Sequence, residues 1–221
     1  MKRLLTLSSL FLVMTMTLSC SKDVVAETTN PLLEEWTTEF GVPPFDKIRT
    51  EHYAPAFEEA MRMHNEEIAA IVASEEEPTF ENVILAMDNA GVKLYELNLI
   101  FGMLSSSDLD DKMQEVQNTM MPRVEEHYDS IMLNDKLFER VKAVYDKRNS
   151  LKLDELQMRL VDKTYNDFVR SGALLEGEAK ELYRKYSSEL SQLTLQFGQN
   201  ALAATNAYSY NITDPAKVSE L

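Results

Sequence analysis

The chain has 221 residues, 44% of them hydrophobic, and its formal net charge at pH 7 is -15, from 37 acidic and 22 basic side chains. Such an acidic surface repels phosphate backbones and makes nucleic acid a poor candidate partner, while the hydrophobic fraction is enough for a core and argues against global disorder. Only 6 Gly and 7 Pro are present, which favours long helices over a turn-rich β architecture.

The first residues resemble a bacterial export signal that ends at a site of lipid attachment. Lys2 and Arg3 precede an apolar stretch from 4 to about 18, which is shorter than the ~20 residues of a membrane-spanning helix. Small residues then lead into Cys20, the only cysteine, although Thr17 stands where the lipoprotein pattern usually has Leu.

This leader sets the expected location of the protein. We expect a lipoprotein signal peptide at 1–19, lipidation of Cys20 as the new amino terminus, and a polar tether over 20–30. The protein would then be exported and anchored by its lipid to a membrane of the bacterial cell envelope, on the periplasmic side or at the surface. Ordinary secretion with an incidental cysteine is the alternative.

Apolar residues recur every three or four positions through most of the remaining chain, which predicts a series of amphipathic helices. We expect helices at about 51–73 and 80–104, over the stripe 116–131, at 135–148, from 154 to about 170, and from 178 past 200. In the last of these, one side carries Leu182, Tyr186, Leu190, Leu193, Phe197 and Leu202. The predicted fold is all-α, built from long antiparallel helices.

Several residues mark the limits or interruptions of these helices. Thr50 and Thr79 are predicted N-caps, and Pro55 is tolerated because it lies in a first turn. Gly91 inside a helix costs about 1 kcal/mol relative to Ala, so close approach of a neighbouring helix is expected there. Pro122 is expected to bend or split its helix.

The segment ahead of the first helix is expected to be extended. The paired prolines Pro43 and Pro44 disfavour helix, so Phe45 and Ile48 are expected to dock as a strap across the helices. Together with the helices, this strap would form one lobe over 31–208.

The chain has no recognisable catalytic motif. Its three histidines, His52, His64 and His127, are never four residues apart, so the two-histidine helix motif of zinc peptidases cannot be written. There is also no Gly-x-Ser-x-Gly sequence, and adjacent carboxylates such as Glu58 and Glu59 diverge by roughly 100° on a helix. The sequence therefore predicts no catalytic, cofactor-binding or metal-binding residue within this chain.

Each histidine has a structural interpretation instead. His64 and Glu67 share a helix face, as in half of a dinuclear metal site, but a packed or surface histidine is the preferred interpretation. His52 is expected to serve exposed backbone groups at a helix start, and His127, beside two glutamates, is expected on the solvent side. The twelve methionines are expected mainly to fill core gaps, with an adaptable peptide groove as the alternative.

A run of motifs nonetheless resembles one family. The residues are Asn30-Pro31-Leu32-Leu33, Trp36, Phe40-Gly41-Val42-Pro43-Pro44-Phe45, Glu51-His52-Tyr53-Ala54-Pro55-Ala56-Phe57-Glu58, Pro78-Thr79-Phe80-Glu81-Asn82, Leu133-Asn134, and the stretches 137–141, 168–174 and 197–200. In order and spacing they resemble the amino-terminal lobe of the thimet oligopeptidase family of zinc metallopeptidases, and within it bacterial peptidyl-dipeptidase and oligopeptidase A.

The resemblance implies a fold and a function. Family members enclose a deep channel between two mostly helical lobes, with the zinc on the carboxy-terminal side, and the peptidyl-dipeptidase branch removes dipeptides from carboxyl ends. This chain would be one wall of that channel, incomplete relative to the two-lobed fold. Residues 209–221 would lead into a missing catalytic region, which would hold the zinc and act on oligopeptides. The chain alone is expected to be inactive, and a free-standing helical lipoprotein that binds peptides or a partner is the alternative.

Overall fold

The computed structural model describes residues 29–213, and all the regular secondary structure in this range is helical. The expected all-α class is therefore confirmed. The leader at 1–19 with Cys20, nearly all of the tether over 20–30, and the end of the segment 209–221 lie outside the described residues. None of the described helices is both long and apolar enough to cross a membrane.

The principal helices follow the predicted order closely. They are α1 (Tyr53–Ala73), α2 (Ala86–Asp88), α3 (Val92–Ser107), α4 (Asp111–Met132), α5 (Asp135–Lys147), α6 (Glu155–Arg170) and α7 (Gly177–Ala207), with a π-helical segment at Phe80–Leu85 ahead of α2. Short 3-10 turns lie at Glu39–Gly41, Thr50–His52 and Arg148–Ser150.

Side-chain caps explain where several of these helices begin. The Thr79 hydroxyl accepts a hydrogen bond from the backbone N–H of Asn82 at 3.1 Å, which confirms the predicted cap. Asp110, Asn134 and Asp154 cap α4, α5 and α6 in the same way. The predicted cap at Thr50 is wrong, because Thr50 lies in a 3-10 turn and α1 begins only at Tyr53.

The predicted helix over 80–104 is interrupted. Gly91 has a φ of +72°, a left-handed conformation that ends the first part and precedes α3. The expected close approach is confirmed, since a Cβ at Gly91 would lie 2.7 Å from the Nδ1 atom of His64 on α1. Pro122 lies within α4, which continues to Met132 without being split.

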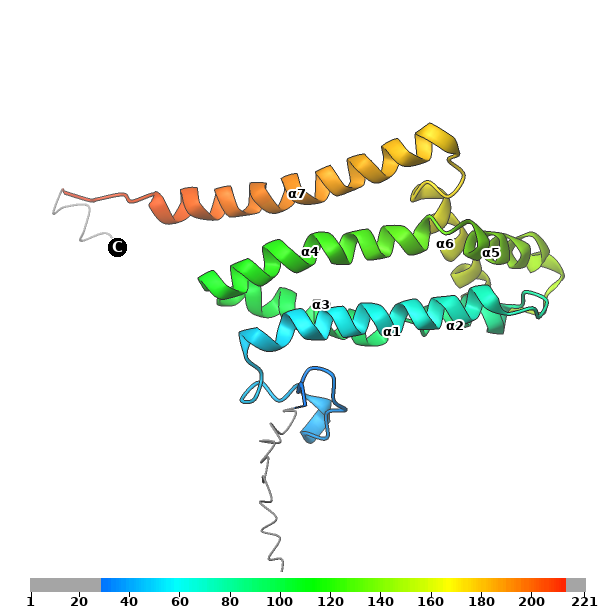
Figure 1. Ribbon diagram of the computed structural model, residues 1–221, viewed down its shortest axis with the longest axis horizontal. Helices are drawn as coiled ribbons and strands as arrows, with labels where there is room; N and C mark the ends of the chain where they lie inside the picture. The colour runs from blue at the N-terminus through cyan, green and yellow to red at the C-terminus, as the bar shows by residue number, and fades with distance from the viewer. Residues whose placement is uncertain (1–28, 214–221) are drawn as a thin grey trace, which may run out of the picture.

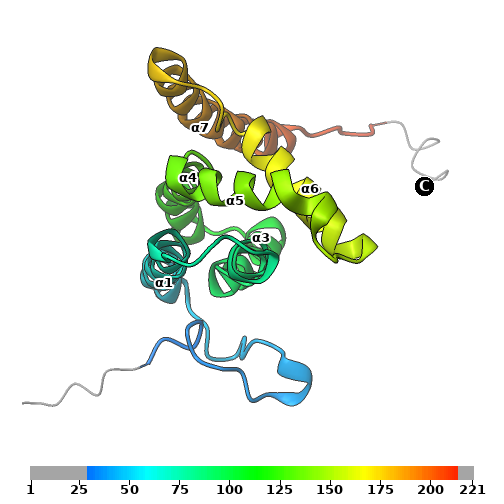
Figure 2. The ribbon, with the colours of Figure 1, turned by 90° about the vertical axis from the view of Figure 1, so that its right-hand side faces the viewer.

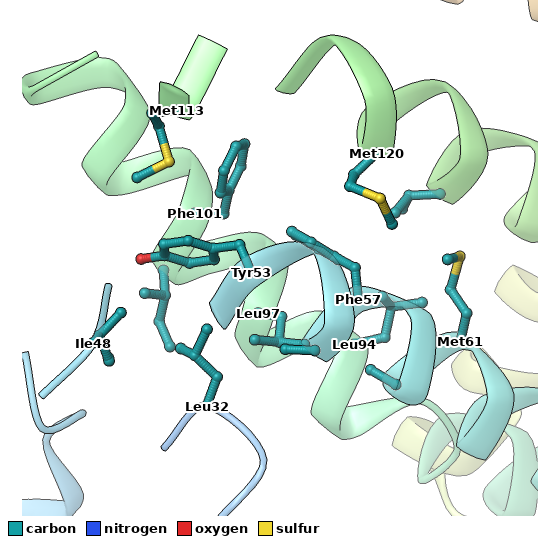
Figure 3. Packing of buried hydrophobic residues seen from close by; sticks show 14 residues of the cluster. Leu32, Ile48, Tyr53, Phe57, Met61, Leu94, Leu97, Phe101, Met113 and Met120 are labelled. Carbon is teal, nitrogen blue, oxygen red and sulfur yellow. The ribbon is translucent and has the colours of Figure 1, made fainter. Parts of the chain in front are cut away.

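The strap ahead of α1 is anchored at its two ends. Leu32 and Ile48 are buried against α1 and α3, and Figure 3 shows both beside Tyr53. The Trp36 indole N–H donates to the carbonyl of Pro31 at 2.9 Å, which folds the segment back on itself. The expectation that Phe45 docks is wrong, because Phe45 stays 39% exposed and outside the core.

Two hydrophobic clusters hold the helices together. The first joins the strap, α1, α3 and the first half of α4, and includes Phe57, Phe101 and Met120 (Figure 3). The second joins the end of α1, the segment around Val83, α5 and α6. Met113 and Met120 are buried, as expected for core methionines, whereas Met103 is half exposed.

Helix α7 stands apart from both clusters. It lies along α4, on the side away from α1 and α3 (Figures 1 and 2). Neither cluster contains a residue of α7, and Lys180 is the one residue of this helix that is buried. The core of the described chain therefore closes without its longest helix.

Candidate functional site

Two histidines that are 63 residues apart in the sequence meet between α1 and α4. The Nε2 atom of His127 lies 3.0 Å from the Nδ1 atom of His64, and each residue is 7% exposed. Burial of His64 agrees with the packed alternative, but the expected solvent position of His127 is wrong. The signal was in the sequence, because His127 is seven residues after Met120 and shares its helix face.

Burial controls the protonation of this pair. It lowers the pKa of His64, an effect that the nearby Glu67 carboxylate partly offsets. Burial, and then the neighbouring His64 ring, lower the pKa of His127 to about 4. Both rings are therefore neutral at pH 7, and one donates a hydrogen bond that the other accepts.

The surroundings of the pair tie three helices together. The carboxylate of Glu67 accepts the backbone N–H of Gly91 at 2.7 Å, which leaves Gly91 against the His64 ring. Tyr128 packs edge-on against both imidazoles, and the Asn98 amide on α3 donates to its hydroxyl at 3.5 Å. His52, by contrast, accepts the backbone N–H of Arg49 at 3.0 Å, as expected for a histidine at a helix start.

A groove of about 480 Å³ opens to solvent between α1 and α4, beside His127. It is lined by Glu58, Met61, Arg62, Asn65, Arg123, Glu126, His127 and Ser130. Across the two helices, Arg123 donates to the Glu58 carboxylate at 2.7 Å, and along α1, Arg62 pairs with Glu59 and Glu66. The open groove is therefore bordered by ion pairs.

The described residues do not fit a catalytic zinc ion. Such an ion takes three protein ligands, and within residues 29–213 no group of three or more His, Cys, Asp or Glu is placed to hold a metal. The His64 Nδ1 atom is engaged by His127, and Glu67 is engaged by Gly91.

A second groove, with both polar and apolar lining, lies between α4 and α7, and sequence reasoning missed it. Its volume is about 550 Å³, and Glu125 and Asp129 from α4 face Ser187 from α7. Burial and then the Asp129 charge raise the pKa of Glu125. Burial also raises the pKa of Asp129, against the opposing effects of Ser187 and Arg184. The available signal was the spacing of four between two carboxylates, which places both on one helix face.

The flank of α7 carries an exposed apolar surface, here called the α7 stripe. It consists of Leu182, Tyr186, Leu190, Leu193 and Phe197, which are 40%, 60%, 65%, 60% and 75% exposed. The groove that α7 shares with α4 is lined by Ser187, Ser191 and Thr194, and also by Tyr183, Leu195 and the stripe residue Leu190. A soluble amphipathic helix normally buries its apolar side, whereas the residues of the α7 stripe are largely exposed to solvent.

The chain was compared with known proteins. No protein-family model matches the sequence. Among curated proteins, the dipeptidyl carboxypeptidase of Escherichia coli K12 is 35% identical over 192 residues, which make up 87% of this chain and 28% of that enzyme. The dipeptidyl carboxypeptidase of Salmonella typhimurium LT2 is 36% identical over 84% of this chain and 27% of the enzyme. Oligopeptidase A of Escherichia coli K12 is 28% identical over 86% of this chain and 28% of the enzyme.

The chain thus spans just over a quarter of the length of these relatives. The relatives are peptidases, and the match covers nearly all of this chain but only their amino-terminal part. From these matches we conclude that the chain belongs to the thimet oligopeptidase family and corresponds to the amino-terminal lobe of its members.

Proposed function

We propose that this chain is the amino-terminal wall of a zinc-dependent peptidyl-dipeptidase, an enzyme that removes dipeptides from the carboxyl ends of oligopeptides. The observation that carries the proposal is the 35% identity to a dipeptidyl carboxypeptidase over 87% of the chain. In this proposal the catalytic zinc and its ligands belong to the remainder of the polypeptide.

The exposed apolar side chains of the α7 stripe are a second argument for the proposal. We propose that its occupant is the part of the polypeptide that aligns with the remaining length of the relatives, of which this chain covers 28%. Five large apolar side chains, spaced three or four residues apart along one helix, are exposed together, and exposed apolar surfaces on soluble proteins mark interfaces. The stripe lies beyond both core clusters, so covering it disturbs no existing packing.

The test compares two proteins. The coding DNA is read beyond the codon for Leu221, and the continuous polypeptide and the 221-residue chain are purified separately. We expect zinc by elemental analysis and release of dipeptides from a free-carboxyl tetrapeptide only with the continuous polypeptide. Stoichiometric zinc and hydrolysis by the 221-residue chain would overturn the proposal. A stop codon directly after Leu221 in an intact gene would also overturn it, in favour of a free-standing binding protein.

The docking surface has a test of its own within the continuous polypeptide. Leu193→Asp and Phe197→Asp place charges on the α7 stripe, where we expect a loss of thermal stability and of peptidase activity. The matched control is Leu156→Asp on α6, because Leu156 is a large apolar residue that is 78% exposed away from the stripe. If the stripe variants lose no more thermal stability and activity than Leu156→Asp does, the stripe is not the docking surface. This conclusion does not depend on whether the 221-residue chain itself hydrolyses peptides.

We also propose that the protein is an envelope lipoprotein attached through Cys20. The proposal rests on the basic start, the short apolar stretch and the single cysteine of the leader. Growth with a labelled fatty acid tests it. The protein should carry the labelled fatty acid and be recovered in the membrane fraction. The Cys20→Ser variant should be unlabelled and absent from that fraction. A protein that remains unlabelled and is released intact into the medium points to ordinary secretion.

A further inference from the structure

The His64–His127 pair is a buried titratable contact that the proposed peptidase function does not use. It joins α1 to α4 directly, through ring nitrogens 3.0 Å apart. The groove at the surface of the same helix pair exposes an edge of His127, so protons and water have a path to the contact. A buried contact with access to solvent can respond to pH.

We propose that the His64–His127 pair is an acid-operated latch, which holds α1 against α4 while the two rings carry at most one charge and releases them when both are charged. With both rings neutral, one of the two facing nitrogens carries a hydrogen and donates it to the other, which accepts. A first added proton leaves one nitrogen free to accept, so the hydrogen bond survives. A second proton places two N–H donors opposite each other and adds the repulsion of two cations, so the contact breaks.

The groups that face the pair decide the order of protonation. On α1, the Glu67 carboxylate favours a positive His64. On α4, Tyr128 packs against both rings. The groove beside His127 is lined by two cations, Arg62 and Arg123, and by two carboxylates, Glu58 and Glu126. From the α3 side, the Gly91 backbone lies against the His64 ring and the Asn98 amide bonds Tyr128, and both of these groups are uncharged. The first charge therefore settles on His64.

The second charge falls on His127, whose pKa is lowered to about 4. A histidine whose pKa is lower in the folded state than in the unfolded state favours folding above its unfolded pKa, about 6.5. That contribution is lost as the pH falls from there towards 4. The Glu58 carboxylate, paired with Arg123, is a second polar contact between the same two helices.

The experiment measures the distance across the groove in the full chain. Spin labels are attached at Asn65→Cys on α1 and Ser130→Cys on α4, both of which line the groove, with Cys20→Ser to prevent labelling elsewhere. Pulsed electron spin resonance from pH 7.5 to pH 3.5 should show a longer distance on the acid side, with its midpoint near pH 4. Far-UV circular dichroism at each pH checks that the helices persist.

Two variants separate the latch from the neighbouring ion pair. His127→Gln keeps a hydrogen-bonding amide but cannot be charged, so its distance should not change in this range. Glu58→Gln removes the ion pair, and its distance should still lengthen near pH 4. If His127→Gln opens with the same midpoint as the unsubstituted pair, the proposal is overturned. The same holds if Glu58→Gln abolishes the transition.

A measurement without histidine substitutions covers the case in which a variant does not fold. The ring nitrogens of His64 and His127 are followed by nitrogen-15 NMR in the unsubstituted chain. We expect two separate protonation steps, His64 first, with the lengthening of the groove coinciding with the second. Lengthening that coincides with the first step, or both rings charged without any lengthening, would refute the latch.

Discussion

The carboxylate of Glu67 on α1 accepts the backbone N–H of Gly91 at 2.7 Å, so the turn that precedes α3 is fastened to the middle of α1. This fastening brings the Gly91 Cα so close to the His64 ring that a Cβ would lie 2.7 Å to 2.9 Å from three of its atoms. The ring cannot move away freely, because its Nδ1 atom is held by the hydrogen bond with His127.

Gly91→Ala should therefore be strongly destabilising. The left-handed backbone, at φ +72°, costs an L-residue roughly 1–2 kcal/mol, and forcing a methyl group into the ring adds about 1–3 kcal/mol. Urea unfolding followed by circular dichroism measures the sum. Gly102→Ala is the control, since a Cβ there meets no atom within 4 Å and replaces glycine inside α3. It should be neutral or stabilising by up to about 1 kcal/mol. Equal effects of the two substitutions would contradict the packing described here.

The attachment of α7 at its start predicts an asymmetry between two substitutions. Lys180 is 7% exposed and its ammonium donates to the Asp135 carboxylate in the first turn of α5. Asp135→Asn leaves a buried cation without its charged partner and should cost about 1–3 kcal/mol. Lys180→Met removes the cation and should cost less.

Asp111→Asn is the matched control for that experiment, because it also removes an acidic residue from the first turn of a helix, here α4. Thermal unfolding of the three variants measures the order. A greater loss in Lys180→Met than in Asp135→Asn would show that the ammonium of Lys180 stabilises the attachment of α7 through more than its pairing with Asp135, because Met keeps the aliphatic stem.

Glu125 predicts a dependence of stability on pH with the opposite sign to the histidine pair. Burial and Asp129 raise the pKa of Glu125 above the ordinary value of 4.5, so the folded state holds this proton more tightly than the unfolded state does. The contribution of Glu125 to the free energy of unfolding is present below pH 4.5, and it is lost as the pH rises through the pKa of the folded state. Glu125→Gln should accordingly unfold at higher urea than the parent chain at pH 7.5, with a smaller difference at pH 4.5. A Gln variant that is less stable at pH 7.5 would contradict this sign.

The α7 stripe predicts the behaviour of the 221-residue chain in solution. Exposed apolar surface binds the dye ANS, and Phe197 alone is 75% exposed. Fluorescence titration should show dye binding that Leu193→Asp together with Phe197→Asp reduces, with the near-UV circular dichroism spectrum retained. The matched substitution Leu156→Asp should leave most of the binding in place. Dye binding that is unchanged in the stripe variants would locate the exposed surface elsewhere.

Helix periodicity predicted most of the fold because the spacing of apolar side chains is a local property. The stripe on α1 from Phe57 to Ile71 is buried as its spacing requires, the predicted cap at Thr79 begins its helix, and α6 begins beside Asp154 as expected. The interruption at Gly91 was not predicted, because the left-handed turn is favoured by contacts with Glu67 and His64 of another helix. Periodicity is assessed over a short stretch of neighbouring residues, and Glu67 and His64 lie too far from Gly91 in the sequence to fall within it.

The site could be predicted only where the chemistry was local. His52 bonds a backbone group three residues away, and this contact was expected. The His64–His127 contact spans 63 residues, so it depends on the register between α1 and α4, which the packing of Phe57 and Met120 determines. The Glu125 and Asp129 pair was missed for the same reason, because its burial comes from α7.

The separation of α7 from both hydrophobic clusters has a consequence for how the protein is made. Residues up to 173 complete those clusters by themselves, so they can assemble while the ribosome is still adding α7 and whatever follows it. Helix α7 then emerges with an attachment point at Lys180 and an apolar flank still unpaired. In the longer polypeptide proposed above, this flank would offer a surface on which the following segment condenses during synthesis.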